Sequence, residues 1–340
     1  MTPKARLQRV LRKEPVDRPP VCCIGGMMNA AIVDVMNRTG HTLPEAHSDG
    51  RRMADLAQDV YTHTGFENIA VPFCMTVEAE LLGAEVTLGT LECEPKIVRE
   101  TFSSVETVDI RDVSKLVQSG RINTVAEAAR RAARDNPDIP VIASLTGPVS
   151  TAASIVDPMA FFKEMRKNPA GVARVLDYVT DLLGAFAERL IAGPDGVTAI
   201  AIGDPSATGE ILGPAMFSKF AVPFINKLAD RVHAAGVPFI VHICGELKNV
   251  RASLPELRAD ALSTDALVSL PALKADYPSI TTMGNVSTFA LQWNDERKIR
   301  AVTRSLIERG VDIISPACGL STSTKLDTIR AMTNEVKGAM

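Results

Sequence analysis

Residues 237–245 read VPFIVHICG, an apolar and β-branched run that ends at a glycine. Such a run predicts a buried strand. Side chains two positions apart on a strand point to the same face, so His242 and Cys244 are expected side by side near its carboxyl end. An imidazole and a thiolate placed in this way form half of the ligand set that zinc prefers.

The same pattern recurs far downstream, where residues 313–319 read IISPACG. Cys318 would therefore come from a different strand and bring a second sulfur to the pair. One His and two Cys, with a fourth position open, match a catalytic zinc site better than a closed structural one. The alternative interpretation is that these cysteines belong to the core, because free Cys is among the most buried residue types.

The composition is that of an ordinary globular chain: 340 residues, 46% hydrophobic, 23% charged and a net charge of −3 at pH 7. This balance gives no reason to expect nucleic acid or a membrane as a partner, and no signal-peptide core or membrane-spanning run is recognisable. One Trp and three Tyr argue against a base-stacking surface. The six cysteines form no dense disulfide framework, which favours a reducing cytoplasm.

Apolar runs that alternate with helical patterns predict a (β/α)8 TIM barrel, with a doubly wound sheet as the alternative. We expect a single domain over residues 1–340, in which the helices and first strand at about 1–65 pack on the barrel. Residues 84–91 and 97–101 alternate in the manner of a small β-hairpin excursion. A basic amphipathic helix at 2–13 is expected to form a solvated cap. The eight strands are predicted at 21–26, 66–73, 139–145, 197–202, 237–245, 260–265, 280–285 and 311–316, and the remaining helices at 27–38, 49–64, 76–82, 120–134, 157–167, 169–192, 214–235, 294–309 and 323–338.

Polar side chains fall at or just past the carboxyl ends of the predicted strands. In a barrel these ends converge on one face, where the chemistry of such folds takes place. This placement favours the barrel over the doubly wound sheet, and it allows residues far apart in sequence to share one metal. The side chains concerned are Asp204, His242, Cys244, Asp265, Asn285 and Cys318.

Several stretches resemble the uroporphyrinogen decarboxylase superfamily, and within it the methylcobamide:coenzyme M methyltransferases. The resemblance covers nearly the whole chain, and its most specific part is H-x-C-G with a distant C-G. The decarboxylase branch fits poorly, because residues 22–29 (CCIGGMMN) carry no cation where decarboxylases present an arginine to a substrate with many carboxylates. The stretches that carry the resemblance are PVDRPPV (15–21), LPEAHSD (43–49), VPFCMTVEAE (71–80), TGPV (146–149), GDPSA (203–207), MGNVS (283–287) and SPACG (315–319).

By this resemblance, His242, Cys244 and Cys318 hold a zinc ion. The acidic residue that the family carries after its sixth strand falls on Asp265, which would fill the open zinc position until a substrate arrives. An Asp is shorter than the Glu expected at that place.

Further positions follow from the same resemblance. Asp204 falls where the superfamily keeps an acidic site residue, with a structural role as the alternative. Asn285 would hydrogen-bond the substrate or the corrinoid, with a structural role as the alternative. His47 would contact the edge of the corrinoid, a surface histidine being the alternative. The thiols of Cys22, Cys23 and Cys74 are expected in the core or at the rim.

The implied reaction moves a methyl group from a methylated corrinoid, carried by a partner protein, to a small thiol such as coenzyme M. The motifs leave open the other half-reaction, in which a methyl ether, methylamine or halomethane methylates the corrinoid protein. Tetrahydrofolate or another thiol as acceptor, and a non-enzymatic corrinoid-binding or zinc-storage barrel, also stay open. Coenzyme M carries a sulfonate, and the sequence does not indicate which Lys or Arg would bind that group. The oligomeric state is not predicted.

Overall fold

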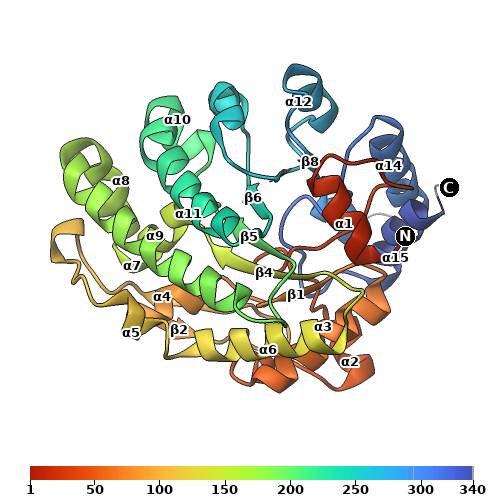
Figure 1. Cartoon of the computed structure of the whole chain (residues 1–340), viewed down its shortest axis with the longest axis horizontal. Coiled ribbons are helices and arrows are strands. Elements are labelled where there is room, and N and C mark those ends of the chain that lie inside the picture. The colour runs from red at the N-terminus through yellow and green to blue at the C-terminus, as the bar shows by residue number, and fades with distance from the viewer. Residues whose placement is uncertain (294, 339–340) are drawn as a thin grey trace.

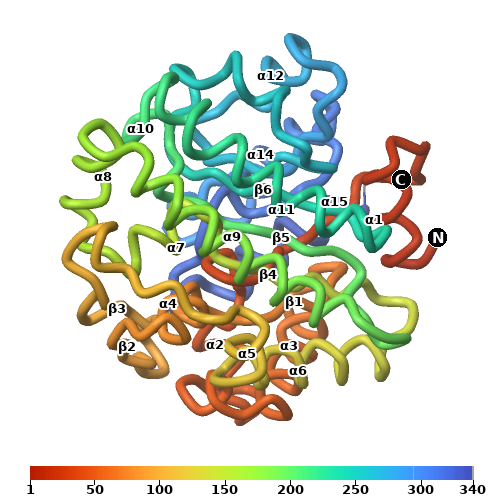
Figure 2. The backbone as a smooth tube through the Cα atoms, turned by 60° about the vertical axis from the view of Figure 1, so that its left-hand side comes forward, coloured from red at the N-terminus to blue at the C-terminus, as the bar shows by residue number. Residues whose placement is uncertain are grey.

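The computed structural model describes residues 1–293 and 295–338 and has one sheet of six parallel strands. The strands neighbour one another in the order β1-β4-β5-β6-β7-β8, and every neighbouring pair is parallel. Helices surround these strands on all sides in the backbone view (Figure 2). The strands are β1 Ile69–Val71, β4 Val141–Thr146, β5 Ala199–Gly203, β6 Phe239–Ile243, β7 Ala261–Thr264 and β8 Thr282–Met283.

Two extended segments complete the ring between β8 and β1. Ile313 bridges Met283 of β8, and its neighbour Ile314 bridges Val21, in both cases in parallel. The amide of Cys22 donates to the carbonyl of Ile314 at 2.9 Å. The predicted strands at 21–26 and 311–316 are thus present as bridged segments, not as full strands. Prolines at 19, 20 and 316 limit the ladder there, because proline has no N–H to donate.

Side chains close the seam between the first of these segments and β1. The amide group of Asn68 donates to the carbonyl of Cys23 at 2.8 Å and accepts from the Cys23 N–H at 2.9 Å. The carboxylate of Glu67 accepts from the Val21 N–H at 3.0 Å. Asn68 is only 2% exposed, so its side chain replaces the backbone ladder that the barrel would otherwise have at this edge.

Nineteen helical segments cover the barrel or cap its ends in the described part of the chain (Figure 1). None of them combines the length and the apolar character that crossing a membrane requires. Their bounds are α1 Pro3–Leu11, α2 Val33–Thr39, η1 Glu45–His47, α3 Gly50–Thr64, α4 Val77–Leu81, η2 Val105–Thr107, α5 Val113–Leu116, α6 Arg121–Asp135, α7 Pro148–Ile155, α8 Pro158–Lys167, α9 Pro169–Ile191, α10 Gly209–Met216, η3 Phe217–Ala221, α11 Val222–Ala234, η4 Lys248–Glu256, α12 Leu270–Asp276, α13 Thr288–Trp293, α14 Glu296–Glu308 and α15 Leu326–Lys337.

Most predicted helices are confirmed, with two clear differences. The helix expected at 27–38 begins only at Val33. The helix expected at 214–235 consists of the end of α10, a π-helical turn η3 and α11. Just before it, α10 is kinked at Gly213, which has a φ of 64° and precedes Pro214. The first residue of the helix expected at 294–309 lies outside the described residues, and α14 begins at Glu296.

Helix α1 is more than the solvated cap that its charges predicted. Its residues Leu7, Val10 and Leu11 are buried in the same apolar cluster as side chains from inside the barrel, such as Ile142 and Ile240. The amino-terminal helix therefore covers the end of the barrel where the strands begin.

The predicted hairpin excursion is confirmed. Strand β2 (Glu85–Thr87) pairs antiparallel with β3 (Lys96–Arg99), separately from the barrel sheet. The carbonyl of Glu92, between the two strands, accepts a hydrogen bond of 2.8 Å from the hydroxyl of Thr322. This bond fastens the tip of the hairpin to the chain just after Cys318.

Replacing Asn68 by alanine tests the side-chain seam. Asn68→Ala leaves the N–H and the carbonyl of Cys23 buried without partners, so the free energy of unfolding should fall by about 2–4 kcal/mol. Urea unfolding followed by circular dichroism measures the change. Asn123→Ala is the matched control, because Asn123 is exposed on α6 and makes one side-chain bond to the Gln118 carbonyl; its cost should stay below about 0.5 kcal/mol. An equal fall in the free energy of unfolding of the two variants would contradict the proposed role of Asn68 at the seam.

Candidate metal centre at the mouth of the barrel

The imidazole of His242 and the sulfurs of Cys244 and Cys318 form one cluster at the carboxyl end of the strands. Each residue offers one donor atom, and these atoms all lie within 4.8 Å of one another. The Nε2 atom of His242 is 3.0 Å from the Sγ of Cys244, which is 2.9 Å from the Sγ of Cys318. The sequence prediction that these three side chains meet is confirmed as geometry.

Glycine is required after each of the two cysteines, for a different physical reason at each position. Gly245 turns the chain directly after Cys244 with a φ of 71°, a left-handed conformation that favours glycine. Gly319 lets the backbone pass close to residue 27, since a Cβ there would lie 2.7 Å from the Met27 carbonyl oxygen. Both glycines therefore serve to bring the cysteines to the same place.

Ser263 on β7 orients the histidine. In the parallel register of β6 and β7, His242 is opposite Ser263, and the serine Oγ lies 2.9 Å from the His242 Nδ1. A proton on Nδ1 then leaves the Nε2 lone pair directed at the sulfurs. Sequence reasoning missed this residue, because a buried serine within a strand gives no signal until the register of the sheet is known.

The two thiols share their protons unequally. The hydrogen bond with Cys244, helped by the nearby His242, lowers the pKa of Cys318 to about 5. The same hydrogen bond and burial raise the pKa of Cys244 well above the ordinary thiol range. This pairing therefore favours the thiolate form at Cys318 and the thiol form at Cys244.

The donor set fits a soft divalent cation. Imidazole nitrogen and thiolate sulfur are the preferred ligands of zinc, with Zn–S bonds of about 2.3 Å. Tetrahedral coordination would place the two sulfurs about 3.8 Å apart, an opening of less than about 1 Å from the observed 2.9 Å. Both cysteines are half-buried, at the rim of the barrel mouth rather than in its packed interior.

Asp265 and Asn285 lie beside this cluster but outside it. Asp265 follows β7 directly, and its charge contributes to the raised pKa of Cys244, yet its carboxylate is not among the donors that meet within 4.8 Å. Asn285 donates to the carbonyl oxygens of Asp265 at 2.7 Å and Val268 at 2.8 Å. These bonds hold the loop after β7. The predicted roles of Asp265 as a ligand and of Asn285 as a substrate contact stay predictions.

Asp204 is fully buried between the end of β5 and the start of α7. Its carboxylate accepts from the N–H of Val149 at 3.1 Å, and from the N–H and hydroxyl of Ser150 at 2.8 and 2.6 Å. Burial raises the pKa of Asp204 to about 6 against these hydrogen bonds. The geometry favours a positioning role at the amino end of α7, while the catalytic role stays a prediction.

His47 is buried, which excludes the alternative of a surface histidine. It ends the short helix η1 with no exposed area, and neither of its ring nitrogens has a hydrogen-bond partner. Burial, with the nearby charge of Arg121, lowers its pKa to about 4. A docked corrinoid would reach this ring only after a local rearrangement, and the predicted contact remains untested.

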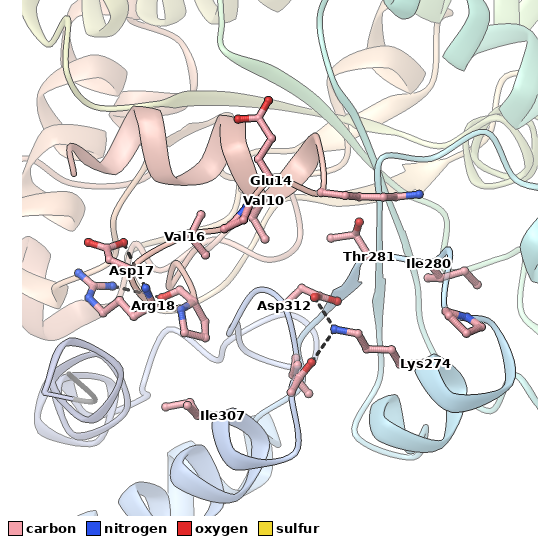
Figure 3. A pocket seen from close by; sticks show the side chains of 16 residues that line it. Val10, Glu14, Val16, Asp17, Arg18, Lys274, Ile280, Thr281, Ile307 and Asp312 are labelled. Carbon is pink, nitrogen blue, oxygen red and sulfur yellow. Dashed lines mark hydrogen bonds and ion pairs between the residues drawn. The ribbon is translucent and has the colours of Figure 1, made fainter.

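Two pockets lie at opposite ends of the barrel. One of about 620 Å³ is lined by residues that precede the strands, including Asp17, Thr281 and Asp312, and Lys274 pairs with Asp312 inside it (Figure 3). The other, of about 530 Å³, is lined by Cys318. Because chemistry in such barrels takes place at the carboxyl ends of the strands, the second pocket is the candidate substrate site.

The fold and the site define a class of protein: parallel barrels that carry a His/Cys/Cys cluster at the carboxyl ends of their strands. The uroporphyrinogen decarboxylase (URO-D) family matches residues 2–339. The methylcobamide:CoM methyltransferase MtbA of Methanosarcina mazei is 32% identical over 97% of this chain and 96% of its own length. The methylcobamide:CoM methyltransferase MtaA of Methanosarcina barkeri is 30% identical with the same coverage. A solved methyltransferase from Methanosarcina mazei superposes with a TM-score of 0.92 at 29% identity, covering 99% of this chain and 98% of that one.

This chain belongs to the uroporphyrinogen decarboxylase family. Together with the structural match, this assigns the architecture to the barrel of that family and rejects the doubly wound sheet.

Substitutions at Asp204 separate its two possible roles. Asp204→Ala leaves two buried amides at the start of α7 unpaired, so the free energy of unfolding should fall by about 3 kcal/mol, and Asp204→Asn should cost less. Denaturant unfolding measures both. A positioning role predicts that the folded Asn variant keeps its metal and most of its turnover; a thousandfold loss of turnover in that variant would instead establish catalysis.

Proposed function

We propose that this protein is a zinc-dependent methyltransferase that moves a methyl group from a methylated corrinoid to a small thiol such as coenzyme M. The observation that carries the proposal is the cluster of His242, Cys244 and Cys318 beside an open pocket. Relatives named methylcobamide:CoM methyltransferases match nearly the whole chain at about 30% identity, which supports the same reaction here.

His242, Cys244 and Cys318 would hold the zinc ion and leave one position for the substrate. When bound, zinc lowers the pKa of a thiol, so that the substrate is present as the thiolate at neutral pH. The cysteines contribute two negative charges, which keep the substrate sulfur electron-rich, and Ser263 holds the imidazole in the ligating tautomer. Asp265 would occupy the open position between turnovers.

The proposed transfer forms a carbon–sulfur bond and breaks a carbon–cobalt bond. The substrate sulfur attacks the methyl carbon, the electron pair of the broken bond stays on cobalt to give cob(I)amide, and the thiol proton passes to solvent. The chain's own residues bind and orient the thiol, and the methyl donor approaches over the barrel mouth.

The corrinoid would arrive on a partner protein that docks around the pocket. Helix α13 carries two exposed aromatic side chains four residues apart, Phe289 (76% exposed) and Trp293 (75% exposed), and Phe289 also lines the pocket. Residues four apart share one face of a helix. Large exposed apolar side chains beside a reactive site are typical of interaction surfaces.

The free state of all six cysteines accords with the proposed reducing cytoplasm.

Removing the two sulfurs tests the metal centre. The Cys244→Ala, Cys318→Ala double variant should lose bound zinc and the demethylation of free methylcobalamin, because one imidazole cannot hold the ion. Plasma mass spectrometry gives the zinc content, and the absorbance change of methylcobalamin gives the rate.

His242→Ala and His41→Ala form a matched pair for the same assay. His41 is half-exposed and pairs with Asp59, away from the cluster, so its variant should keep both zinc and rate. A double cysteine variant with full activity would end the proposal. Tetrahydrofolate and several thiols in parallel assays identify the acceptor, and activity with none of them would favour a methyl donor upstream of the corrinoid protein.

Trp293→Ser tests the docking surface. A loss of about 1–2 kcal/mol in binding is usual for an exposed aromatic anchor, so the KM for a methylated corrinoid protein should rise about tenfold. The rate with free methylcobalamin should not change, because Trp293 does not line the pocket. Steady-state kinetics with the two donors decide the matter, and equal effects on both donors would contradict a docking role.

A further inference from the structure

The pocket beside Cys318 is built from Met27 and three further parts of the chain that are distant in sequence. The loop after Cys318, helix α13 and the tip of the β2–β3 hairpin all contribute lining residues. The Thr322–Glu92 hydrogen bond of 2.8 Å holds the hairpin tip against that loop. The hairpin therefore supplies side chains to the neighbourhood of the metal cluster.

Three charged residues of the hairpin line this pocket: Glu92, Glu94 and Lys96. Burial and the charge of Cys318 raise the pKa of Glu94, while Lys96 lowers it. Glu94 and Lys96 line the same pocket as Cys318. Lys96 is the single basic side chain among the described residues that line the pocket.

Lys96 is available for a ligand. The ion pair of the hairpin joins Arg99 to Glu85 at 2.8 Å, and in the described part of the chain no carboxylate forms an ion pair with Lys96. The lysine side chain is exposed, long and flexible, and it begins β3 at the rim of the pocket. An ammonium group in this position can turn toward a small anion bound near Cys318.

We propose that Lys96 binds the anionic end of the thiol substrate while its sulfur lies at the Cys318 cluster. This inference rests on the proposed function and adds to it the group that recognises the acceptor. A thiol such as coenzyme M has its anionic group only two carbons from its sulfur, so the countercharge must come from the wall of the same pocket.

The carboxylates of Glu92 and Glu94 explain why an anionic thiol needs a basic partner in this pocket. Glu92 and Glu94 would repel an anionic thiol, and they would tolerate a neutral one. With Lys96 present, an anion gains a charge-assisted hydrogen bond in a partly enclosed pocket, which is stronger than its exposed equivalent. Lys96 thereby offsets part of that repulsion and allows an anionic thiol to bind in a pocket whose carboxylates would otherwise disfavour it.

Lys96→Gln separates charge recognition from chemistry. With free methylcobalamin as donor, its KM for coenzyme M should rise about tenfold, the value expected from losing one charge-assisted bond. Its kcat, its zinc content and its KM for 2-mercaptoethanol should stay at wild-type values. Calorimetric titration of the zinc-loaded protein with coenzyme M should show the same tenfold loss of affinity without any turnover.

Two further variants complete the design. Lys96→Arg keeps the charge and should keep most of the affinity for coenzyme M. Lys298→Gln removes an exposed lysine on α14 that does not line the pocket, and should leave both thiols unaffected. Raised salt should weaken coenzyme M binding to the wild type, because it screens the attraction between Lys96 and the anion. It should not weaken binding to Lys96→Gln, where screening acts only on the repulsion from Glu92 and Glu94.

The outcomes distinguish the two proposals. A wild type that methylates both thiols, with an unchanged KM for coenzyme M in Lys96→Gln, overturns the role of Lys96 and leaves the methyl transfer intact. A wild type that methylates neither thiol overturns the proposed function itself. An equal rise in KM for both thiols would assign Lys96 to pocket structure and overturn charge recognition.

Discussion

Closure of a parallel barrel is the constraint on which the site depends. The sulfurs of Cys244 and Cys318 are 2.9 Å apart although the residues are 74 positions apart in sequence. They meet because β6 and the bridged segment at 313–316 run in the same direction around one ring and end at the same face.

The two ends of the barrel have different tasks. At the end where the strands begin, Arg6 and Arg18 both pair with the buried carboxylate of Glu67, and α1 covers the apolar interior. A buried carboxylate with two arginine partners is satisfied and unavailable for chemistry. At the other end, Cys244 and Cys318 are only half-buried. Their shared hydrogen bond raises the pKa of Cys244 and lowers the pKa of Cys318. The stable end holds the ring closed, and the reactive end faces the pocket.

The hairpin excursion connects the fold to the acceptor. It stands outside the barrel sheet, yet its tip is tied to the loop after Cys318 and lines the pocket there. An insertion of this kind changes which charges face the substrate and leaves the barrel register alone. In barrels of this type, loops at the carboxyl ends of the strands commonly carry the specificity.

The sequence by itself determined the barrel, the hairpin and the three side chains that meet at the candidate metal site. Strand periodicity places His242 and Cys244 on one face, and a glycine follows each cysteine. Only the tertiary structure decided which neighbours serve them. Ser263 became visible through the register of β6 and β7, Asp204 through its three bonds at the start of α7, and Lys96 through the position of the hairpin tip. Local patterns encode the direction of a side chain within its own strand, whereas contacts between distant segments depend on how the ring closes, and no short-range pattern records that closure.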